Sequence, residues 1–113
     1  MLRRILVFVM VASAVAFSAW AVENKGAEQL VLEGGTRGPV PFPHHRHQNA
    51  IGDCNVCHSI FPQEPGSIER MKAQGQIAAK QVMTKLCIQC HRSKRKEGKT
   101  SGPLTCSKCH VKE

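Results

Sequence analysis

The longest apolar stretch of the chain lies at its N-terminus and runs from Ile5 to Val22. It follows a short basic head and ends in Ala19-Trp20-Ala21, an A-x-A sequence typical of a signal-peptide cleavage site. We therefore expect a signal peptide over residues 1–21 and one exported domain over residues 22–113. Because the 18 residues of the stretch would just suffice to cross a membrane, the alternative is an uncleaved anchor.

Two short apolar segments come next, and they flank a glycine-rich stretch. Leu30–Leu32 and Val40–Phe42 enclose Gly34-Gly35-Thr36-Arg37-Gly38, which predicts two short strands joined by a turn. Prolines in and beside the second segment restrict it to a sheet edge or an extended conformation. The residues before the first strand, 22–28, are expected to form a loose leader.

Helical spacing of apolar residues appears only in the second half of the chain. It predicts one or two helices between Ser67, a candidate N-cap, and about Leu86, with an interruption near Gly75. The apolar positions concerned are Ile77, Ala78, Val82 and Leu86. Residues 92–103 are polar and basic and predict a loop. The pattern as a whole indicates a small, loop-rich α+β fold with a short N-terminal two-stranded hairpin and a few helices.

The composition of the chain provides too few large apolar side chains to form a core for such a fold. After removal of the signal, the chain has 92 residues, no Tyr or Trp, and only Phe42 and Phe61 as aromatic side chains. A domain of this size with so few large apolar residues buries too little surface to be stable on its own. We therefore expect bound groups to supply the missing apolar bulk.

Every cysteine lies in the same five-residue pattern, C-x-x-C-H, which occurs three times, at Cys54–His58, Cys87–His91 and Cys106–His110. Two thiols three residues apart fall on one side of a helical turn, so both can form thioethers to the vinyl groups of one porphyrin. The histidine that follows then projects toward the iron as its proximal ligand. The sequence therefore predicts three covalently attached haem c groups around which the fold is wrapped. Their porphyrins are held by Cys54, Cys57, Cys87, Cys90, Cys106 and Cys109, and their irons by His58, His91 and His110.

Zinc binding and disulfide formation are the alternatives for these cysteine pairs. Zinc knuckles use C-x-x-C, but they do not require a histidine directly after every pair. Export agrees with haem attachment, because c-type haem is attached outside the cytoplasm. Three haems would also consume all six thiols and leave none over.

The charge of the chain is compatible with this interpretation. The formal net charge is +8, and removal of the signal leaves +6. A basic balance often indicates a nucleic-acid or membrane partner. Here the propionates of three haems would bring up to six negative charges, so nucleic-acid binding is not supported. A basic run after the second motif either docks an acidic redox partner or balances propionates; it comprises Arg92, Lys94, Arg95 and Lys96, with Lys99 beyond.

The sixth coordination position of each iron needs a second ligand. Only His44, His45 and His47 lie outside the three motifs, and simple counting would make all three haems bis-histidine. Adjacent histidines in an extended segment point in opposite directions and would serve different haems. Three irons are hard to reach from four residues, because consecutive α-carbons are only about 3.8 Å apart. Met71 and Met83 are the methionines left after cleavage, and a thioether is a natural haem ligand.

The stretch Val40–Ala50, followed by Asp53-Cys54 and the three motifs, resembles the three-haem class III c-type cytochromes. This family, usually called cytochrome c7, belongs to the cytochrome c3 superfamily, and the resemblance extends from about residue 29 to the C-terminus. It implies that His44 binds the first iron opposite His58, and that His47 binds the middle iron opposite His91.

The resemblance also bears on the last haem, whose usual ligand in this family is a histidine four residues before the middle motif. That position is Met83 here. The resemblance therefore implies Met83 opposite His110, with His45 a non-ligand. Two alternatives stay open: Met83 is an ordinary apolar helix residue, or His45 is the third distal ligand.

The resemblance implies a periplasmic electron carrier, not an enzyme, which stores electrons and relays them between respiratory redox partners. One alternative is a haem reductase with an open or weakly ligated iron, since open coordination is what iron catalysis requires. Another is a subunit of a respiratory complex that is anchored in the inner membrane and faces the periplasm, its membrane contact made by an uncleaved N-terminus.

Overall fold

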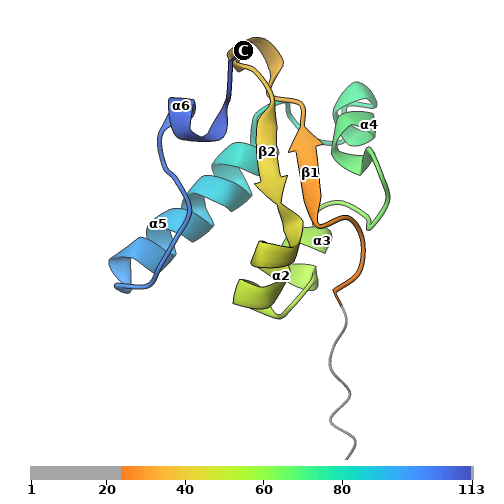
Figure 1. Ribbon diagram of the computed structural model, residues 1–113. Helices are drawn as coiled ribbons and strands as arrows, with labels where there is room; N and C mark the ends of the chain where they lie inside the picture. The colour runs from red at the N-terminus through yellow and green to blue at the C-terminus, as the bar shows by residue number, and fades with distance from the viewer. Residues whose placement is uncertain (1–23, 113) are drawn as a thin grey trace, which may run out of the picture.

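The computed structural model describes residues 24–112 (Figure 1). The expected signal peptide and its cleavage site lie outside these residues. In chain order the elements are β1 (Gln29–Leu32), a 3-10 turn η1 (Gly35–Arg37), β2 (Val40–Pro43), α2 (His44–Ile51), α3 (Asn55–His58), α4 (Ser67–Ala73), a π-helical segment η2 (Met83–Cys87), α5 (Ile88–Lys96) and α6 (Cys106–Cys109). Within residues 24–112, no helix is both long and apolar enough to cross a membrane.

The N-terminal hairpin confirms the two strands expected from the sequence. β1 and β2 pair antiparallel, with Leu30 opposite Phe42 and Leu32 opposite Val40. Pro41 is tolerated within β2 because each strand of a two-stranded sheet is an edge strand. The glycine-rich turn between them contains η1 and ends at Gly38, whose φ of 100° favours glycine.

The histidine-rich segment after β2 is helical, so the expectation of an extended segment is wrong. α2 begins at His44 directly after Pro43 and ends at Ile51, where Gly52 takes the left-handed conformation with φ of 73°. On a helix, residues three apart share a face and immediate neighbours do not. His44 and His47 therefore lie on one face of α2, and His45 is turned away from them.

The segment before β1 is irregular but not loose, contrary to expectation. The side chains of α2 hold it: the Gln48 amide donates to the Lys25 carbonyl at 2.8 Å, and the amide of Asn24 donates to the side chain of Asn49 at 2.8 Å. The His45 backbone N–H adds a bond to the Glu28 carbonyl at 3.2 Å. Residues 24–28 are thus attached to α2 along its length.

The helical half differs from expectation at its boundaries. Ser67 is the first residue of α4, and Gly66, with φ of 69°, occupies the N-cap position. Gly75 breaks the helix as expected, but Ile77 and Ala78 lie in the connection that follows it. The basic residues 92–96 belong to α5 and not to a loop, because Lys and Arg have high helix propensity and prolong the turn begun by the second motif.

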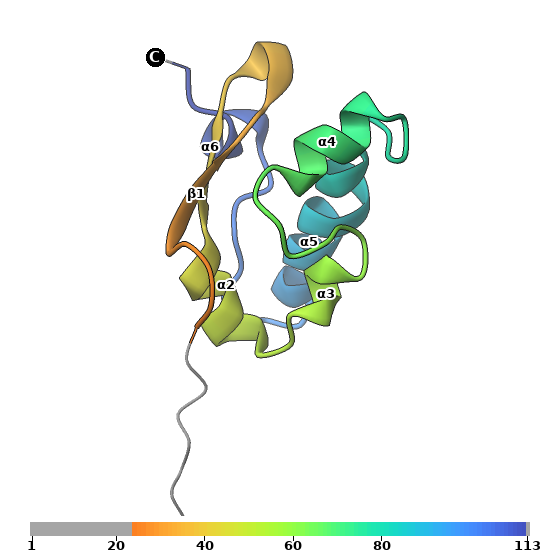
Figure 2. The same ribbon diagram turned by 90° about the vertical axis from the view of Figure 1, so that its right-hand side faces the viewer.

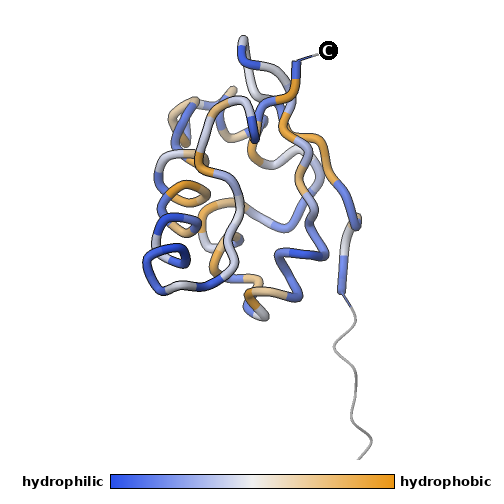
Figure 3. The backbone as a smooth tube through the Cα atoms, turned by 60° about the vertical axis from the view of Figure 1, so that its left-hand side comes forward, coloured by the Kyte–Doolittle hydropathy of each residue, from blue (hydrophilic) through white to orange (hydrophobic). Residues whose placement is uncertain are grey.

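The polypeptide has almost no core of its own. Figure 2 shows the hairpin and α2 along one side and α3, α4 and α5 along the other, and apolar segments occur on both sides (Figure 3). Among the described residues, Ile77 is the only buried apolar residue, with 7% of its surface exposed. This is the small, loop-rich architecture expected from the sequence, and it lacks the packed side-chain interior of an ordinary domain of its size.

Candidate haem-binding sites

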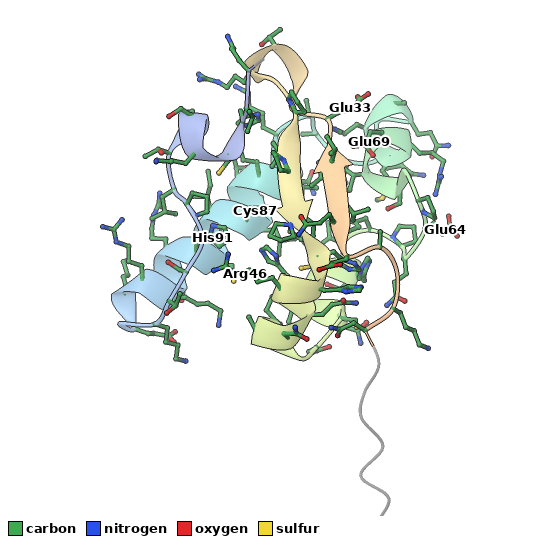
Figure 4. The ribbon with its side chains drawn as sticks, viewed as in Figure 1. Glu33, Arg46, Glu64, Glu69, Cys87 and His91 are labelled. Carbon is green, nitrogen blue, oxygen red and sulfur yellow. The ribbon has the colours of Figure 1, made fainter. Side chains whose placement is uncertain are left out.

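Each C-x-x-C-H motif lies on a helical turn, as haem attachment requires. Cys54 precedes α3, which carries Cys57 and His58. The second motif begins at the last residue of η2 and continues into α5, and the third forms α6 with His110 directly after it. The labelled Cys87 and His91 of the second motif lie toward β2 and α2 (Figure 4). All six thiols are free, so the disulfide alternative is not observed.

The three motifs are close neighbours, with the second between the other two. Burial raises the pKa of the Cys57 thiol, and the charge of Cys90 raises it further. Burial likewise raises the pKa of Cys87, with contributions from the charges of Cys57 and Cys109. Burial also raises the pKa of Cys109. Because only nearby charges have such an effect, the cysteine pairs lie within short range of one another, as closely spaced haems require.

Two histidines of α2 lie opposite two motif histidines. The ring centres of His44 and His58 are 6.4 Å apart with an interplanar angle of 83°, and those of His47 and His91 are 6.2 Å apart with an angle of 30°. A metal ion lies about 2 Å from an imidazole nitrogen, so two imidazoles on opposite sides of one metal have ring centres about 6 Å apart. Both pairs therefore have the separation of two axial ligands on a single iron.

The motif histidines all use the same ring nitrogen for a hydrogen bond to the backbone. Their acceptors are the carbonyls of Phe61 for His58 (3.1 Å), Pro103 for His91 (2.8 Å) and Gly38 for His110 (2.9 Å). Since a carbonyl only accepts, Nδ1 must be the protonated nitrogen in each ring. The lone pair is then on Nε2, the arrangement found in metal-bound histidines.

The three histidines of α2 differ in which ring nitrogen bonds the backbone. Nδ1 of His44 donates to the Ala27 carbonyl at 2.9 Å, and Nδ1 of His47 donates to the Pro43 carbonyl at 2.8 Å. His45 differs, because it is Nε2 that bonds the backbone, at the Gly26 carbonyl (3.1 Å). The described ring pairs of His45 include only its neighbour His44, at 6.1 Å, and no motif histidine. His44 and His47 thus bond the backbone through Nδ1 and each forms a ring pair with a motif histidine, whereas His45 does neither.

The third site is less complete than the other two. Within residues 24–112, His110 takes part in no ring pair of the kind made by His58 and His91. Met83 is half-buried and opens η2, whose widened turn is closed by the Ile88 N–H bonding to the Met83 carbonyl. Turns of this kind occur frequently at functional sites. The assignment of Met83 to the third iron stays a prediction.

The donor set fits haem and not zinc. The described residues contain no group of three or more His, Cys, Asp or Glu side chains that could hold a metal ion, whereas a structural zinc site needs four ligands. What the chain offers is pairs of imidazoles, each next to a pair of thiols. A porphyrin supplies the remaining four nitrogens of such a site.

Sequence reasoning missed the acceptor carbonyls and the π-helical segment. The carbonyls belong to the backbone and are not encoded by any side chain. The glycines at Gly34, Gly38 and Gly102 were the available signal, because glycine permits the close approach of another group.

The family model and the related proteins that match this chain are all cytochromes of the c7 and c3 type. Residues 40–111 match the family model described as cytochrome c7 and related cytochrome c. A cytochrome c7 of Geobacter metallireducens is 34% identical over 86 residues, which cover 76% of this chain and 78% of that protein. A 26 kDa cytochrome c3 of Desulfomicrobium norvegicum is 28% identical, over 71% of this chain and 86% of its own length.

Solved structures give the same result. The solution structure of the triheme cytochrome PpcA from Geobacter sulfurreducens aligns with a TM-score of 0.54 and 34% identity, over 76% of this chain and all of that one. The cytochrome c7 PpcC from the same organism aligns with a TM-score of 0.53 and 28% identity, over 77% of this chain and all of that one. Together with the three haem-binding motifs, these matches show that the chain belongs to the cytochrome c7 family and is a triheme electron carrier, not an enzyme.

Proposed function

We propose that the chain relays electrons between respiratory redox partners through three haems whose axial positions are all filled. The ligand pairs are His44 with His58, His47 with His91, and Met83 with His110. The two imidazole pairs with ring centres 6.4 Å and 6.2 Å apart carry the proposal. Haem supplies the one-electron chemistry, and the chain supplies ligands, spacing and local field.

Filled axial positions make the protein a relay. An iron with two strong protein ligands has no position for a substrate, so it exchanges electrons without making or breaking bonds. Each ligand histidine is held through Nδ1, which keeps it in place in both oxidation states. The close approach of the three motifs supports transfer between neighbouring haems within one molecule.

Met83 is the proposed sixth ligand of the third iron because it combines position and chemistry. It lies four residues before Cys87, where the resemblance implies a ligand, and it is half-buried. The histidine that could replace it, His45, has its Nε2 engaged by the Gly26 carbonyl. A thioether stabilises ferrous iron relative to imidazole, so we expect the third haem to have the highest potential.

A basic surface on α5 is the proposed docking site for an acidic redox partner. Lys94 and Arg95 follow His91 by three and four residues and share its face of the helix, so they are placed to balance the propionates of the second haem. Arg92 and Lys96, four residues apart, share a different face and are exposed. These two are the better candidates for contact with the partner.

Lys99 contributes less to that surface. Its Nζ lies 2.8 Å from Oε2 of Glu97, so part of its charge is neutralised within the chain. The four cations of α5 are thus the docking residues we propose, with Arg92 and Lys96 outermost. They lie within two turns of His91, which keeps the path from a docked partner to the second haem short.

We also propose that residues 22–113 act in the periplasm after cleavage behind Ala21. Support comes from the A-x-A sequence and from the chemistry of haem attachment, which takes place outside the cytoplasm. Intact mass of the exported protein tests this directly. A mass for residues 22–113 plus three haems is expected, whereas a membrane fraction that retains residues 1–21 would favour an anchored subunit of a respiratory complex.

A haem reductase is the competing function, and the third site is where it would act, because His110 has no imidazole partner among the described residues. Carbon monoxide separates the two functions, because it binds ferrous haem only where a position is open. The relay predicts that the reduced native protein binds carbon monoxide poorly at all three haems. Rapid binding of one equivalent would favour the reductase.

A further inference from the structure

The segment before the third motif passes very close to the histidine of the second. A β-carbon placed on Gly102 would lie 2.6 Å from Nε2 and 2.8 Å from Nδ1 of His91, with Cε1 nearer still. These ring atoms are its three closest neighbours. The φ of Gly102 is not positive, so a left-handed backbone is not the reason for glycine at this position. Glycine is needed at this position to leave room for the imidazole ring.

The close approach of Gly102 to the His91 ring places the carbonyl of the next residue, Pro103, beside the ring. The Pro103 carbonyl accepts the hydrogen bond from Nδ1 of His91 at 2.8 Å. Because Gly102 has no side chain, the backbone can lie against the ring and bring this carbonyl to Nδ1. Proline has no N–H of its own and a fixed φ, which limits the other arrangements of this carbonyl.

The third site repeats the arrangement with a different segment. Gly34 has φ of −106° and ψ of 11°, which any residue can adopt. A β-carbon on Gly34 would nevertheless collide with Nδ1 of His110 and with the Gly38 carbonyl oxygen. That carbonyl accepts the hydrogen bond from Nδ1 of His110 at 2.9 Å. The Val111 N–H, bonded to the Pro39 carbonyl at 2.9 Å, holds the two segments together.

The first site is built differently. His58 donates to the Phe61 carbonyl, only three residues further along the chain, and Phe61 also packs edge-on against the His58 ring at 5.2 Å between centres. The acceptors for His91 and His110 are 12 and 72 residues away. The orientation of the first motif histidine is therefore local, whereas the other two depend on distant backbone.

We propose that Gly102 and Gly34 are positioning residues of the second and third haem sites. Each omits a side chain so that a distant carbonyl, from Pro103 or Gly38, fixes the orientation and the Nδ1 proton of the proximal imidazole. Such a bond increases the electron donation of the ligand and stabilises ferric iron, which lowers the haem potential. In the third site the N-terminal hairpin turn thus sets the potential of a haem attached near the C-terminus. The inference rests on the proposed function in one respect, that His91 and His110 are proximal ligands.

The test uses the two alanine variants of the mature triheme protein, Gly102→Ala and Gly34→Ala. With iron bound at Nε2, the ring cannot swing away, so the added methyl group must displace the carbonyl and weaken the bond to Nδ1. Loss of an outer-shell partner of this kind typically costs 10-fold or more in metal affinity or activity. A tenfold change in the preference of the site for ferric over ferrous iron corresponds to a shift of about 59 mV. We expect Gly102→Ala to raise the potential of the second haem, and Gly34→Ala that of the third, with the other haems nearly unchanged.

Each variant is the other's control, and two further substitutions match them locally. Ser101→Ala changes the residue next to Gly102 and adds no atom to the chain. Gly35→Asn keeps a residue tolerant of the left-handed conformation at φ of 61°, where a β-carbon would meet nothing within 4 Å. Both are expected to leave all three potentials unchanged. Equal shifts in all haems, or shifts in the controls as large as in the variants, would overturn the proposal.

A measurement on the unaltered protein covers the case in which a variant fails to mature. In the reduced holoprotein, the Nδ1–H protons of His91 and His110 should appear in the NMR spectrum as slowly exchanging, hydrogen-bonded protons. Rapid exchange of both would refute the proposal. Failure of the proposed ligand set looks different: a high-spin haem in the unaltered protein would disprove filled axial positions, whatever the glycine variants do.

Discussion

The imidazole rings of His47 and His91 lie 6.2 Å apart between centres and only 30° from parallel. They come from α2 and α5, two helices separated by 36 residues of chain. Nδ1 of each ring donates a hydrogen bond to a backbone carbonyl. Phe42 packs 4.3 Å from His47 and restricts its ring further. Two rings held in this way have the arrangement that the proposed axial ligand pair of the second iron requires.

Substitution of His47 should therefore affect one haem. We expect His47→Ala to convert the second haem to a high-spin, carbon monoxide-binding form, because His91 alone remains on its iron. His45→Ala is the matched control from the same helix and should leave all three haems low-spin. Absorption and EPR spectra distinguish these outcomes, and a high-spin haem in the His45 variant would mean that the ligand assignment is wrong.

Substitutions of Met83 should affect the third haem alone. Met83→His should lower its potential, because imidazole favours ferric iron relative to a thioether and axial ligands set haem potentials over a range of about 0.8 V. Met83→Ala should open the site or recruit His45. Redox titration of each haem measures the effect. If Met83→Ala left all potentials intact while His45→Ala disrupted one haem, His45 would be the ligand.

Charge reversal on the outer face of α5 should slow docking. The double variant Arg92→Glu/Lys96→Glu should react with an acidic redox partner about tenfold more slowly at low ionic strength, with the difference shrinking as salt screens the charges. Stopped-flow kinetics against ionic strength measure this. Lys80→Glu/Lys112→Glu, exposed residues outside α5, is the control with the same change in net charge. Equal slowing in both pairs would point to net charge and not to a docking surface.

Removal of the haems should remove the fold. Ile77 is the one buried apolar residue in the described chain, and for small chains the burial of apolar surface and the loss of conformational entropy balance to about 0 kcal/mol even with an ordinary core. We expect the exported chain with all six cysteines changed to serine to show no cooperative thermal transition by circular dichroism, in contrast to the holoprotein. A sharp transition in the haem-free chain would show that the side chains suffice.

Local sequence signals predicted the parts of the fold that local interactions determine. The hairpin followed from two apolar segments around glycines, and the break at Gly75 from its backbone freedom. α2 was missed because His44–Ile51 carries few apolar residues to reveal a period. The attachment of residues 24–28 was missed because it depends on bonds from side chains of α2 to backbone carbonyls 17 to 23 residues away and to the Asn24 side chain 25 residues away.

The residues of the candidate haem sites also fall into those that the sequence predicted and those that required the structure. The cysteines and motif histidines could be read from spacing alone, since one helical turn fixes their chemistry. The choice of His44 and His47 over His45 came from the family resemblance, and the helix supplies its physical reason, because residues three apart share a face and immediate neighbours do not. The carbonyls of Pro103 and Gly38 needed tertiary structure, because two segments remote in sequence meet there.

The central claim is that two haems are bis-histidine and one is histidine–methionine. Near-infrared magnetic circular dichroism of the oxidised protein tests it most directly, because each axial ligand pair gives its own charge-transfer band. Our account predicts low-spin bands for two bis-histidine haems and one histidine–methionine haem per molecule, with no high-spin band. Three bis-histidine haems, or a high-spin third haem, would contradict it.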